Sequence, residues 1–394
     1  MQRAIVLQTI STASKSAKLE KFSSAALVAY NQLLSSREDC SKFMEFHHKT
    51  LSSCKKNTSF NVQVVCSLIL DAWRKNTKSV KSVCVKFNVP RNCKTFSTKS
   101  NFFVELGIIP RQRIAVPIKK NRNFQRYSTL VSDGWICKTY GLLPDGQVVA
   151  YLSKEKEIKP RKNVLGIDIN AKHFAISILS PTGKVLYQTY FGKHIWARRK
   201  QLVVRRATLQ SFKSKRKLAK LKTTERNFVK TNLGKIVKEV IKLARRFDAE
   251  ISIENLSKFK PKGKFFNRIV MRIPFAEFKS ILEQRCFDNN IPLNIIDSWH
   301  TSKWCSHCGA VGSGHSTNYS LFRCKDCGQV VNSDRKASLA IAIKSLLERK
   351  HNPNQTCFQI SNRRVPVNGL MRSYENVGVV AVHDTSTFTE CPRF

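Results

Sequence analysis

Four cysteines have the spacing of a metal site. Two residues separate Cys305 from Cys308, two separate Cys324 from Cys327, and 15 residues lie between the pairs. Zinc favours four soft ligands in a tetrahedron, and each Cys-x2-Cys turn supplies two of them. The spacing therefore predicts a structural Zn²⁺ site with four thiolate ligands and no open position for catalysis.

Three carboxylates stand at the ends of distant segments. Asp168 lies in GIDIN, Glu254 in ISIEN, and Asp334 opens a helix just after the cysteines. Each has an ordinary structural explanation, since Asp168 could face solvent from a strand, Glu254 could end a strand and Asp334 could cap its helix. Carboxylates that converge can instead bind two Mg²⁺ ions, which activate a water and stabilise the leaving oxygen of a phosphodiester. Taken together, the three acids predict a nuclease.

The segments around these acids alternate between strand and helix patterns. Three apolar runs come first, followed by a long helical stretch, a strand, a helix, a strand, the cysteine insertion and a last helix. This order predicts an RNase H-like α/β fold, whose sheet brings the three acids together. The expected strands are 163–170, 173–180, 184–191, 249–255 and 292–302, and the expected helices are 197–247, 275–288 and 335–348.

The charge of the chain indicates a polyanionic partner. There are 70 Lys and Arg against 26 Asp and Glu, a formal net charge of +44. This excess is spread along the chain, which favours extended contact with nucleic acid over binding to a membrane surface. We find no run of about 18 apolar residues and no secretion signal. We therefore expect a cytoplasmic or nucleoid-associated protein of a prokaryotic cell, with no membrane partner.

Two basic segments are the best candidates for contact with phosphates. Residues 198–246 hold 18 Lys and Arg but only two acids, Glu225 and Glu239, so most of these cations lack an internal partner. A second basic and aromatic stretch follows Glu254. A charge run is often just a solvated helix face, but the shortage of acids favours a phosphate-facing surface. The predicted nucleic-acid contacts are Arg198, Arg199, Arg205, Arg206, Lys213, Lys215, Arg216, Lys217, Lys262, Lys264 and Arg268.

Changes of pattern along the chain predict four domains and a C-terminal tail. A helical domain is expected at 11–89, and a β-rich domain at 1–10 and 90–160. The nuclease domain is expected at 161–298 and 331–349, interrupted by the zinc-binding insertion at 299–330. Residues 350–394 lack periodicity and are expected to be a loosely ordered tail.

From about residue 163 to 348 the chain resembles the RuvC-type nuclease module of TnpB proteins and type V CRISPR effectors. GIDIN and ISIENLSKF resemble the first two motifs of the module, WHTSKWCSHCG the approach to its zinc-binding insertion, and CKDCGQVVNSDRKASLAI the third motif. The resemblance implies that Asp168, Glu254 and Asp334 are catalytic Mg²⁺ ligands. It also implies that the insertion contacts the target strand, and that the N-terminal half corresponds to the wedge and recognition domains.

The third motif departs from the family pattern. The family reads Asp-x-Asp-x-Asn-Ala-Ala, whereas this chain reads Asn332-Ser333-Asp334-Arg335-Lys336-Ala337-Ser338. The catalytic acid is retained as Asp334, while Asn332 and Lys336 replace two supporting residues. We therefore expect activity, with altered contacts around Asp334.

The activity implied by the resemblance is RNA-guided cutting of double-stranded target DNA, with a guide RNA, catalytic Mg²⁺ and structural Zn²⁺. The sequence leaves the oligomeric state open, as it does the choice between a transposon-encoded TnpB and a compact CRISPR effector. Two alternative functions are that of a nuclease-inactive RNA-guided DNA-binding regulator and that of an RNA-independent structure-specific nuclease. Retention of all three acids argues against the first, and the second would leave the N-terminal half without a role.

Overall fold

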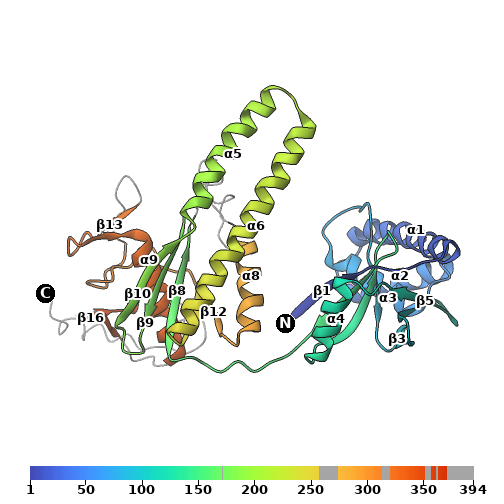
Figure 1. Cartoon of the computed structure of the whole chain (residues 1–394), viewed down its shortest axis with the longest axis horizontal. Coiled ribbons are helices and arrows are strands. Elements are labelled where there is room, and N and C mark those ends of the chain that lie inside the picture. The colour runs from blue at the N-terminus through green and yellow to red at the C-terminus, as the bar shows by residue number, and fades with distance from the viewer. Residues whose placement is uncertain (171, 257–273, 313–319, 351–355, 361–362, 371–394) are drawn as a thin grey trace. The chain divides into compact units, whose positions relative to one another are not determined.

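A computed structural model of the protein describes residues 1–170, 172–256, 274–312, 320–350, 356–360 and 363–370 (Figure 1). The chain divides into two compact units, Met1–Lys156 and Glu157–Phe394. None of the helices in these ranges combines the length and the hydropathy needed to span a membrane.

The first unit combines helices with two antiparallel sheets. One sheet has the order β1-β7-β6-β2 and the other β3-β4-β5. The N-terminal strand joins the β-rich part of the unit, because β1 pairs with β7 from Gln2↔Ser153 to Leu7↔Val148. The elements are α1 (Ala13–Ser36), η1 (Arg37–Asp39), α2 (Phe43–Asn57), α3 (Val62–Arg74), α4 (Arg122–Ser132), β1 (Gln2–Leu7), β2 (Val85–Asn88), β3 (Cys93–Ser97), β4 (Phe102–Ile109), β5 (Gln112–Ile118), β6 (Ile136–Leu142) and β7 (Val148–Ser153).

Helix α4 was not expected within the β-rich segment. It buries Tyr127 and Leu130, which lie three residues apart on one face of the helix. Its start is fixed by Asn121, whose side chain accepts hydrogen bonds from the backbone N–H groups of Asn123 and Phe124. This N-cap is the local signal that could have predicted the helix. The separation of this half into a helical and a β-rich domain stays a prediction, since both parts lie in one compact unit.

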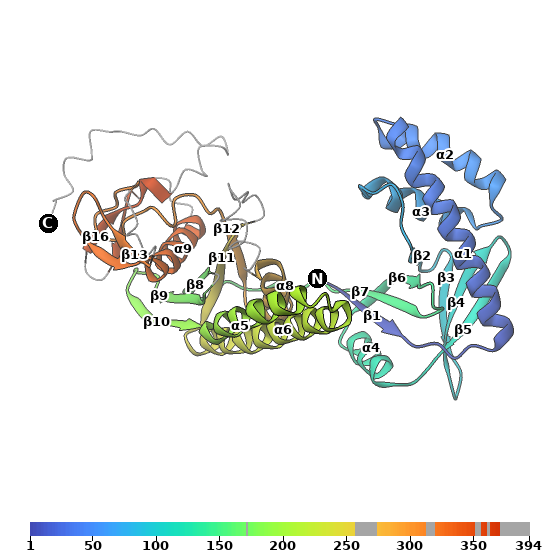
Figure 2. The ribbon, with the colours of Figure 1, turned by 90° about the horizontal axis from the view of Figure 1, so that it is seen from above.

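The second unit is built on a five-stranded sheet of order β10-β9-β8-β11-β12 (Figure 2). Strands β10, β9 and β8 are antiparallel neighbours, whereas β8, β11 and β12 run parallel. This is the predicted RNase H-like arrangement, with three hairpin-connected strands followed by two strands reached through helices. The strands are β8 (Asn163–Ile169), β9 (Phe174–Leu179), β10 (Val185–Phe191), β11 (Ala249–Glu254) and β12 (Leu293–Ile296).

Helices cover both faces of this sheet. Alternate residues of a strand point to opposite faces, and in β8 Leu165 and Ile167 pack with α6 and α8, while Val164 packs with α9. The even-numbered positions of β8 therefore face α9. Within the described residues of this unit, the α-helices are α5 (Lys193–Ser211), α6 (Lys215–Arg246), α8 (Phe275–Asp288) and α9 (Ser333–Lys350).

Gly166 allows α9 to approach the sheet closely. A Cβ atom on this residue would lie 2.3 Å from the backbone oxygen of Ser338 and 2.7 Å from the backbone nitrogen of Ala342. Both atoms belong to the backbone of α9 and cannot rotate away. Two serine pairs reinforce the contact, since the hydroxyls of Ser177 and Ser338 lie 2.7 Å apart and Ser252 donates to Ser345 at 2.7 Å.

We expect Gly166→Ala to lower the free energy of unfolding by about 3 kcal/mol, because the added methyl group must displace α9. Chemical denaturation gives the value. Gly234→Ala is the matched control, since a Cβ atom on that helical glycine would have nothing within 4 Å and alanine favours a helix by about 0.5–1 kcal/mol. Equal stability of the two variants would show that α9 does not lie this close to β8.

The insertion before α9 contains a small hairpin of β13 (Leu321–Arg323) and β14 (Val330–Asn332). Beyond α9, the prediction that residues 350–394 form a loosely ordered tail is corrected in part. Residues 356–360 and 363–370 contain a hairpin of β15 (Cys357–Ile360) and β16 (Arg363–Pro366) and the short helix η2 (Asn368–Leu370). Buried residues of this segment, Phe358, Ile360, Val365, Val367 and Leu370, pack in the core beside α9. These strands are only four residues long, too short for a convincing periodicity.

Candidate active site

The sheet brings Asp168 and Glu254 side by side. Strands β8 and β11 are parallel, with Ile167 opposite Ile253 in the register. The next residue of each strand is the acid, so both carboxylates leave the carboxyl ends of neighbouring strands toward the α9 face. Both residues are half-buried.

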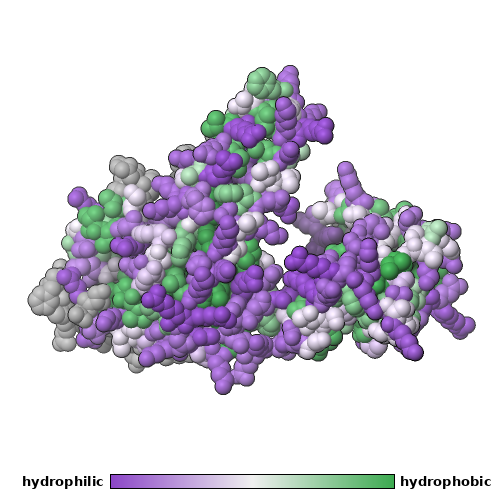
Figure 3. All heavy atoms as spheres, in the orientation of Figure 1, coloured by the Kyte–Doolittle hydropathy of each residue, from purple (hydrophilic) through white to green (hydrophobic). Residues whose placement is uncertain are grey.

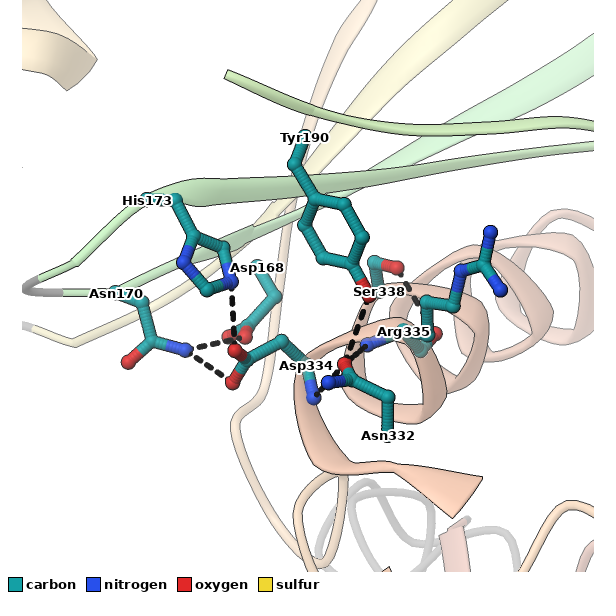
Figure 4. A network of polar contacts seen from close by, with 8 residues as sticks. All are labelled: Asp168, Asn170, His173, Tyr190, Asn332, Asp334, Arg335 and Ser338. Atoms are coloured by element: carbon teal, nitrogen blue, oxygen red, sulfur yellow. Dashed lines mark hydrogen bonds and ion pairs between the residues drawn. The ribbon is translucent and has the colours of Figure 1, made fainter. Parts of the chain in front are cut away.

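The first turn of α9 brings Asp334 close to Asp168 (Figure 4). The side-chain amide of Asn170 donates to Asp168 Oδ2 at 3.2 Å and also to Asp334 Oδ1. His173 Nε2 lies 2.7 Å from Asp334 Oδ2. The Asn170 amide thus bridges two carboxylates that would otherwise repel one another, while His173 contacts one of them.

The electrostatics of this cluster favour a bound cation. Burial raises the pKa of Asp168 well above its ordinary value, and the negative charges of Glu254 and Asp334 raise it further. Burial also raises the pKa of Glu254, against the opposing effects of Thr301 and Lys344. Within the described residues, the buried oxygen Oε1 of Glu254 has no hydrogen-bond partner. Such an oxygen is a natural ligand for Mg²⁺, so the residues fit a divalent ion.

These shifts predict a stability that depends on pH and Mg²⁺. A carboxyl whose pKa is higher in the folded than in the unfolded chain stabilises the fold only while protonated, so its contribution is lost as the pH rises above the unfolded value of 3.8 toward the raised folded value. Asp168→Asn removes this penalty. In a chelator, we expect the variant's Tm advantage over wild type to grow as the pH rises above 3.8 and to shrink when Mg²⁺ is added. A difference independent of pH would contradict the burial of this charge.

Several residues around the acids were missed by sequence reasoning. Asn170 follows Asp168 within GIDIN, and His173 opens the next strand, so polar side chains in the turn after an acid-bearing strand were the available signal. Tyr190 of β10 donates its hydroxyl hydrogen to Asn332 Oδ1 at 2.8 Å, and its ring contacts His173 edge-on with centroids 4.9 Å apart. These contacts join β8, β9, β10 and α9 around the cluster.

Asn332 supports Asp334 despite the departure from the family motif. Its Oδ1 accepts hydrogen bonds from the backbone N–H groups of Asp334 at 3.2 Å and Arg335 at 3.1 Å. An asparagine oxygen caps a helix start about as well as a carboxylate. The cap is therefore kept without a further negative charge beside Asp334.

Lys336 is the second residue that departs from the third motif of the family. Its side chain contacts the turn before Cys305. Its side chain is only 2% exposed, and Nζ donates to the backbone oxygens of Thr301, Ser302 and Trp304 at 3.4, 2.5 and 3.0 Å. Nζ also lies 4.0 Å from the centre of the Phe322 ring. Burial lowers the pKa of Lys336 to about 8. Lys336 thus ties the helix that carries Asp334 to the turn before Cys305.

We expect Lys336→Met to lower the free energy of unfolding by about 3 kcal/mol, because buried carbonyl groups left unpaired cost about 1–3 kcal/mol each. Denaturant titration measures the loss. Lys238→Met, at an exposed position of α6, is the control. The contacts of Lys336 would be dispensable if both variants unfolded at the same denaturant concentration.

The four cysteines converge as their spacing predicted. All four Sγ atoms lie within 4.8 Å of one another, with Cys305 and Cys327 3.8 Å apart and Cys308 and Cys324 3.5 Å apart. Zn–S bonds of about 2.3 Å in a tetrahedron place sulfurs about 3.8 Å apart. The cluster therefore has the dimensions to hold a metal ion.

The predicted nucleic-acid contacts divide into three groups. Arg199 Nε lies 3.1 Å from Glu225 Oε1, and Arg206 contacts the other oxygen of the same carboxylate. These two arginines join α5 to α6, so phosphate is not their only available partner. Exposed side chains belong to Arg198, Arg205, Lys213, Lys215, Arg216 and Lys217, and their contact with nucleic acid stays a prediction. Lys262, Lys264 and Arg268 lie outside the described residues.

Comparisons with known proteins agree with this arrangement. A family model described as "Cas12f1-like, TNB domain" matches residues 275–341, which include β12 of the five-stranded sheet, the cysteine cluster and the start of α9. The TnpB-like protein MJ0751 of Methanocaldococcus jannaschii is 24% identical over 204 residues, 48% of this chain and 73% of that protein. The TnpB-like protein aq_aa05 of Aquifex aeolicus is 26% identical over 214 residues, 47% of this chain and 68% of that protein.

The fold is also similar to a solved effector. The structure of Cas12f1 in complex with sgRNA and target DNA superposes with a TM-score of 0.59, at 15% identity, over 84% of this chain and 83% of that chain. This likeness concerns the fold, while the sequence matches and the order of the motifs concern the family. The chain is therefore similar in sequence to TnpB-like proteins and in fold to a type V effector, and its second unit has a RuvC-type, RNase H-like fold.

Proposed function

We propose that the protein is an RNA-guided endonuclease that cuts target DNA by Mg²⁺-dependent hydrolysis. The observation that carries the proposal is the convergence of Asp168, Glu254 and Asp334, from β8, β11 and α9, within an RNase H-like fold. Single acids at the ends of strands are common. Three that share one site, where two of them raise the pKa of the third, have no evident structural use.

Asp168, Glu254 and Asp334 would hold the catalytic Mg²⁺, and the buried, unpaired Oε1 of Glu254 supports this assignment. When bound, Mg²⁺ supplies an activated water and charge stabilisation at the leaving oxygen of the phosphodiester. Asn170 orients Asp168 and Asp334 toward each other, and Asn332 fixes the first turn of α9. Together these side chains keep the carboxylates in place while the scissile phosphate binds.

The four cysteines would hold a structural Zn²⁺ that shapes the insertion at 299–330. Four thiolates leave no position for a water or a substrate, so this ion would take no part in the reaction. Lys336 and the C-terminal hairpin reach the same region, since Trp304 Nε1 donates to the backbone oxygen of Pro366 at 3.1 Å. We assign contact with the target strand to this insertion, by similarity to the family.

Guide RNA would supply sequence selection. In such effectors base pairing reads the target, while the protein holds the heteroduplex through its backbone. A formal net charge of +44 suits a protein that holds a large RNA and DNA together. The likeness to Cas12f1, whose solved complex contains sgRNA and target DNA, supports the same partners. The N-terminal unit would then serve as wedge and recognition domains, at 1–10 and 90–160 and at 11–89.

The test compares the protein purified with its RNA and the same protein after nuclease removal of that RNA. We expect cutting of duplex DNA only with RNA, Mg²⁺ and a target that matches the sequenced copurifying RNA. Cutting by the RNA-free protein would favour an RNA-independent structure-specific nuclease. Guided binding without cutting would favour a regulator. A guide derived from a CRISPR repeat or from a transposon end would identify the type of system.

A further inference from the structure

An aromatic side chain is exposed to solvent at the tip of the α5–α6 hairpin. Phe212 follows the last residue of α5 and is 75% exposed, the largest exposed fraction among the large hydrophobic side chains of the described residues. Figure 3 shows that the surface of this hairpin carries hydrophilic and hydrophobic side chains together. Because most of the surface of this side chain lies outside the core, its ring is available to a partner.

The backbone holds this tip in a defined turn. Phe212 N–H donates to the Thr208 oxygen at 3.3 Å, Lys213 N–H to the Gln210 oxygen at 3.0 Å, and Ser214 N–H to the Leu209 oxygen at 3.2 Å. Lys213 adopts a left-handed conformation with φ of 49°, which a non-glycine residue rarely adopts. The turn therefore fixes the point at which the ring leaves the hairpin.

The charge around the ring is of one sign. Residues 193–224 contain 12 Lys and Arg and no Asp or Glu. Glu225, the first acid beyond them, already pairs with Arg199 and Arg206. Close to Phe212 in the sequence, the side chains of Lys213, Lys215, Arg216 and Lys217 are all exposed. An apolar contact at this tip must therefore come from a partner that also carries dense negative charge.

We propose that Phe212 stacks on an unpaired nucleobase of bound nucleic acid while the neighbouring cations hold the flanking phosphates. Every nucleobase has a π-face that can stack on a Phe ring, and a phosphate lies on either side of each nucleotide along the strand. Other apolar partners would have to bring their own anions. The inference rests on the proposed binding of nucleic acid and adds a base-contacting residue to it.

The experiment measures the affinity of the full-length protein for a fluorescent single-stranded DNA of about 20 nucleotides at fixed salt. We expect Phe212→Ala and Phe212→Leu to weaken binding about 5- to 150-fold, the equivalent of about 1–3 kcal/mol per stacked base. Phe212→Trp should bind as well as wild type. Val204→Ala, at an exposed apolar position of α5, is the matched control and should change nothing.

A strand whose bases are replaced by abasic sites separates stacking from charge. Wild type and Phe212→Ala should bind this strand equally, because only the phosphates remain. Full binding by Phe212→Leu, or a loss in Phe212→Ala that persists on the abasic strand, would overturn base stacking. If wild type binds and cuts DNA while Phe212→Ala matches Val204→Ala in affinity, this inference fails alone. If wild type binds no nucleic acid, the proposed function fails with it.

Discussion

Replacing Asp168 by asparagine should reduce Mg²⁺-dependent cutting of target DNA by about 10³-fold or more. Metal ions contribute several kcal/mol of charge stabilisation in the transition state, and each 1.4 kcal/mol corresponds to about a factor of ten in rate. An amide is close in shape to the carboxylate but carries no charge, so Mg²⁺ loses its central ligand. Single-turnover cleavage with guide-loaded protein measures the effect.

DNA binding by the same variant should stay within about twofold of wild type, because the predicted phosphate contacts lie in other parts of the chain. Asp248→Asn is the control, since this exposed aspartate has a left-handed φ of 44°, a conformation that asparagine also accepts. It should cut normally. Normal cutting by Asp168→Asn would show that Asp168 has no catalytic role and is only a polar residue at the end of β8.

Replacing Cys324 by serine should remove the metal from the insertion and destabilise it by several kcal/mol. Structural zinc contributes about 10–16 kcal/mol to the folding of small zinc-binding peptides, so one lost thiolate affects the whole cluster. Cys324 is buried beside Cys305 and Phe322, and Phe322 in turn contacts Lys336. We therefore expect slower cutting as well, because α9 loses part of its support.

Metal analysis of the purified protein and its thermal unfolding measure this effect together. Wild type should contain about one zinc per chain, and Cys324→Ser should contain little or none. Cys66→Ser, a half-buried thiol of α3 outside the cluster, is the control and should keep its zinc. An unchanged zinc content and Tm in Cys324→Ser would show that the four thiolates do not form the site.

The sheet of the second unit and the convergence of the acids and of the cysteines could be predicted because their signals are local. Asp168 ends an apolar run, Glu254 ends another, and each cysteine pair is four residues long. The order of the runs was enough to indicate the fold, which the strand order β10-β9-β8-β11-β12 confirms.

The contacts that the residues around the acids make could not be predicted, because these contacts join distant segments. Asn170 contacts Asp334 across 164 positions of the chain. In the sequence, Lys336 stands where the family motif has a supporting asparagine, so the support seemed to be lost. In the structure, its ammonium group donates to backbone oxygens 32 to 35 residues earlier in the chain. The C-terminal hairpin was missed for a related reason, since its short strands are stabilised by packing beside α9 rather than by their own pattern.

Cleavage of a matched DNA duplex by the purified protein–RNA complex, with wild type and Asp334→Ala compared at equal DNA occupancy, tests the central claim most directly. We predict that wild type cuts in Mg²⁺ but not in a chelator, and that Asp334→Ala binds the same duplex without cutting it. Cutting by Asp334→Ala at the wild-type rate, or stable binding without cutting by wild type, would contradict the account.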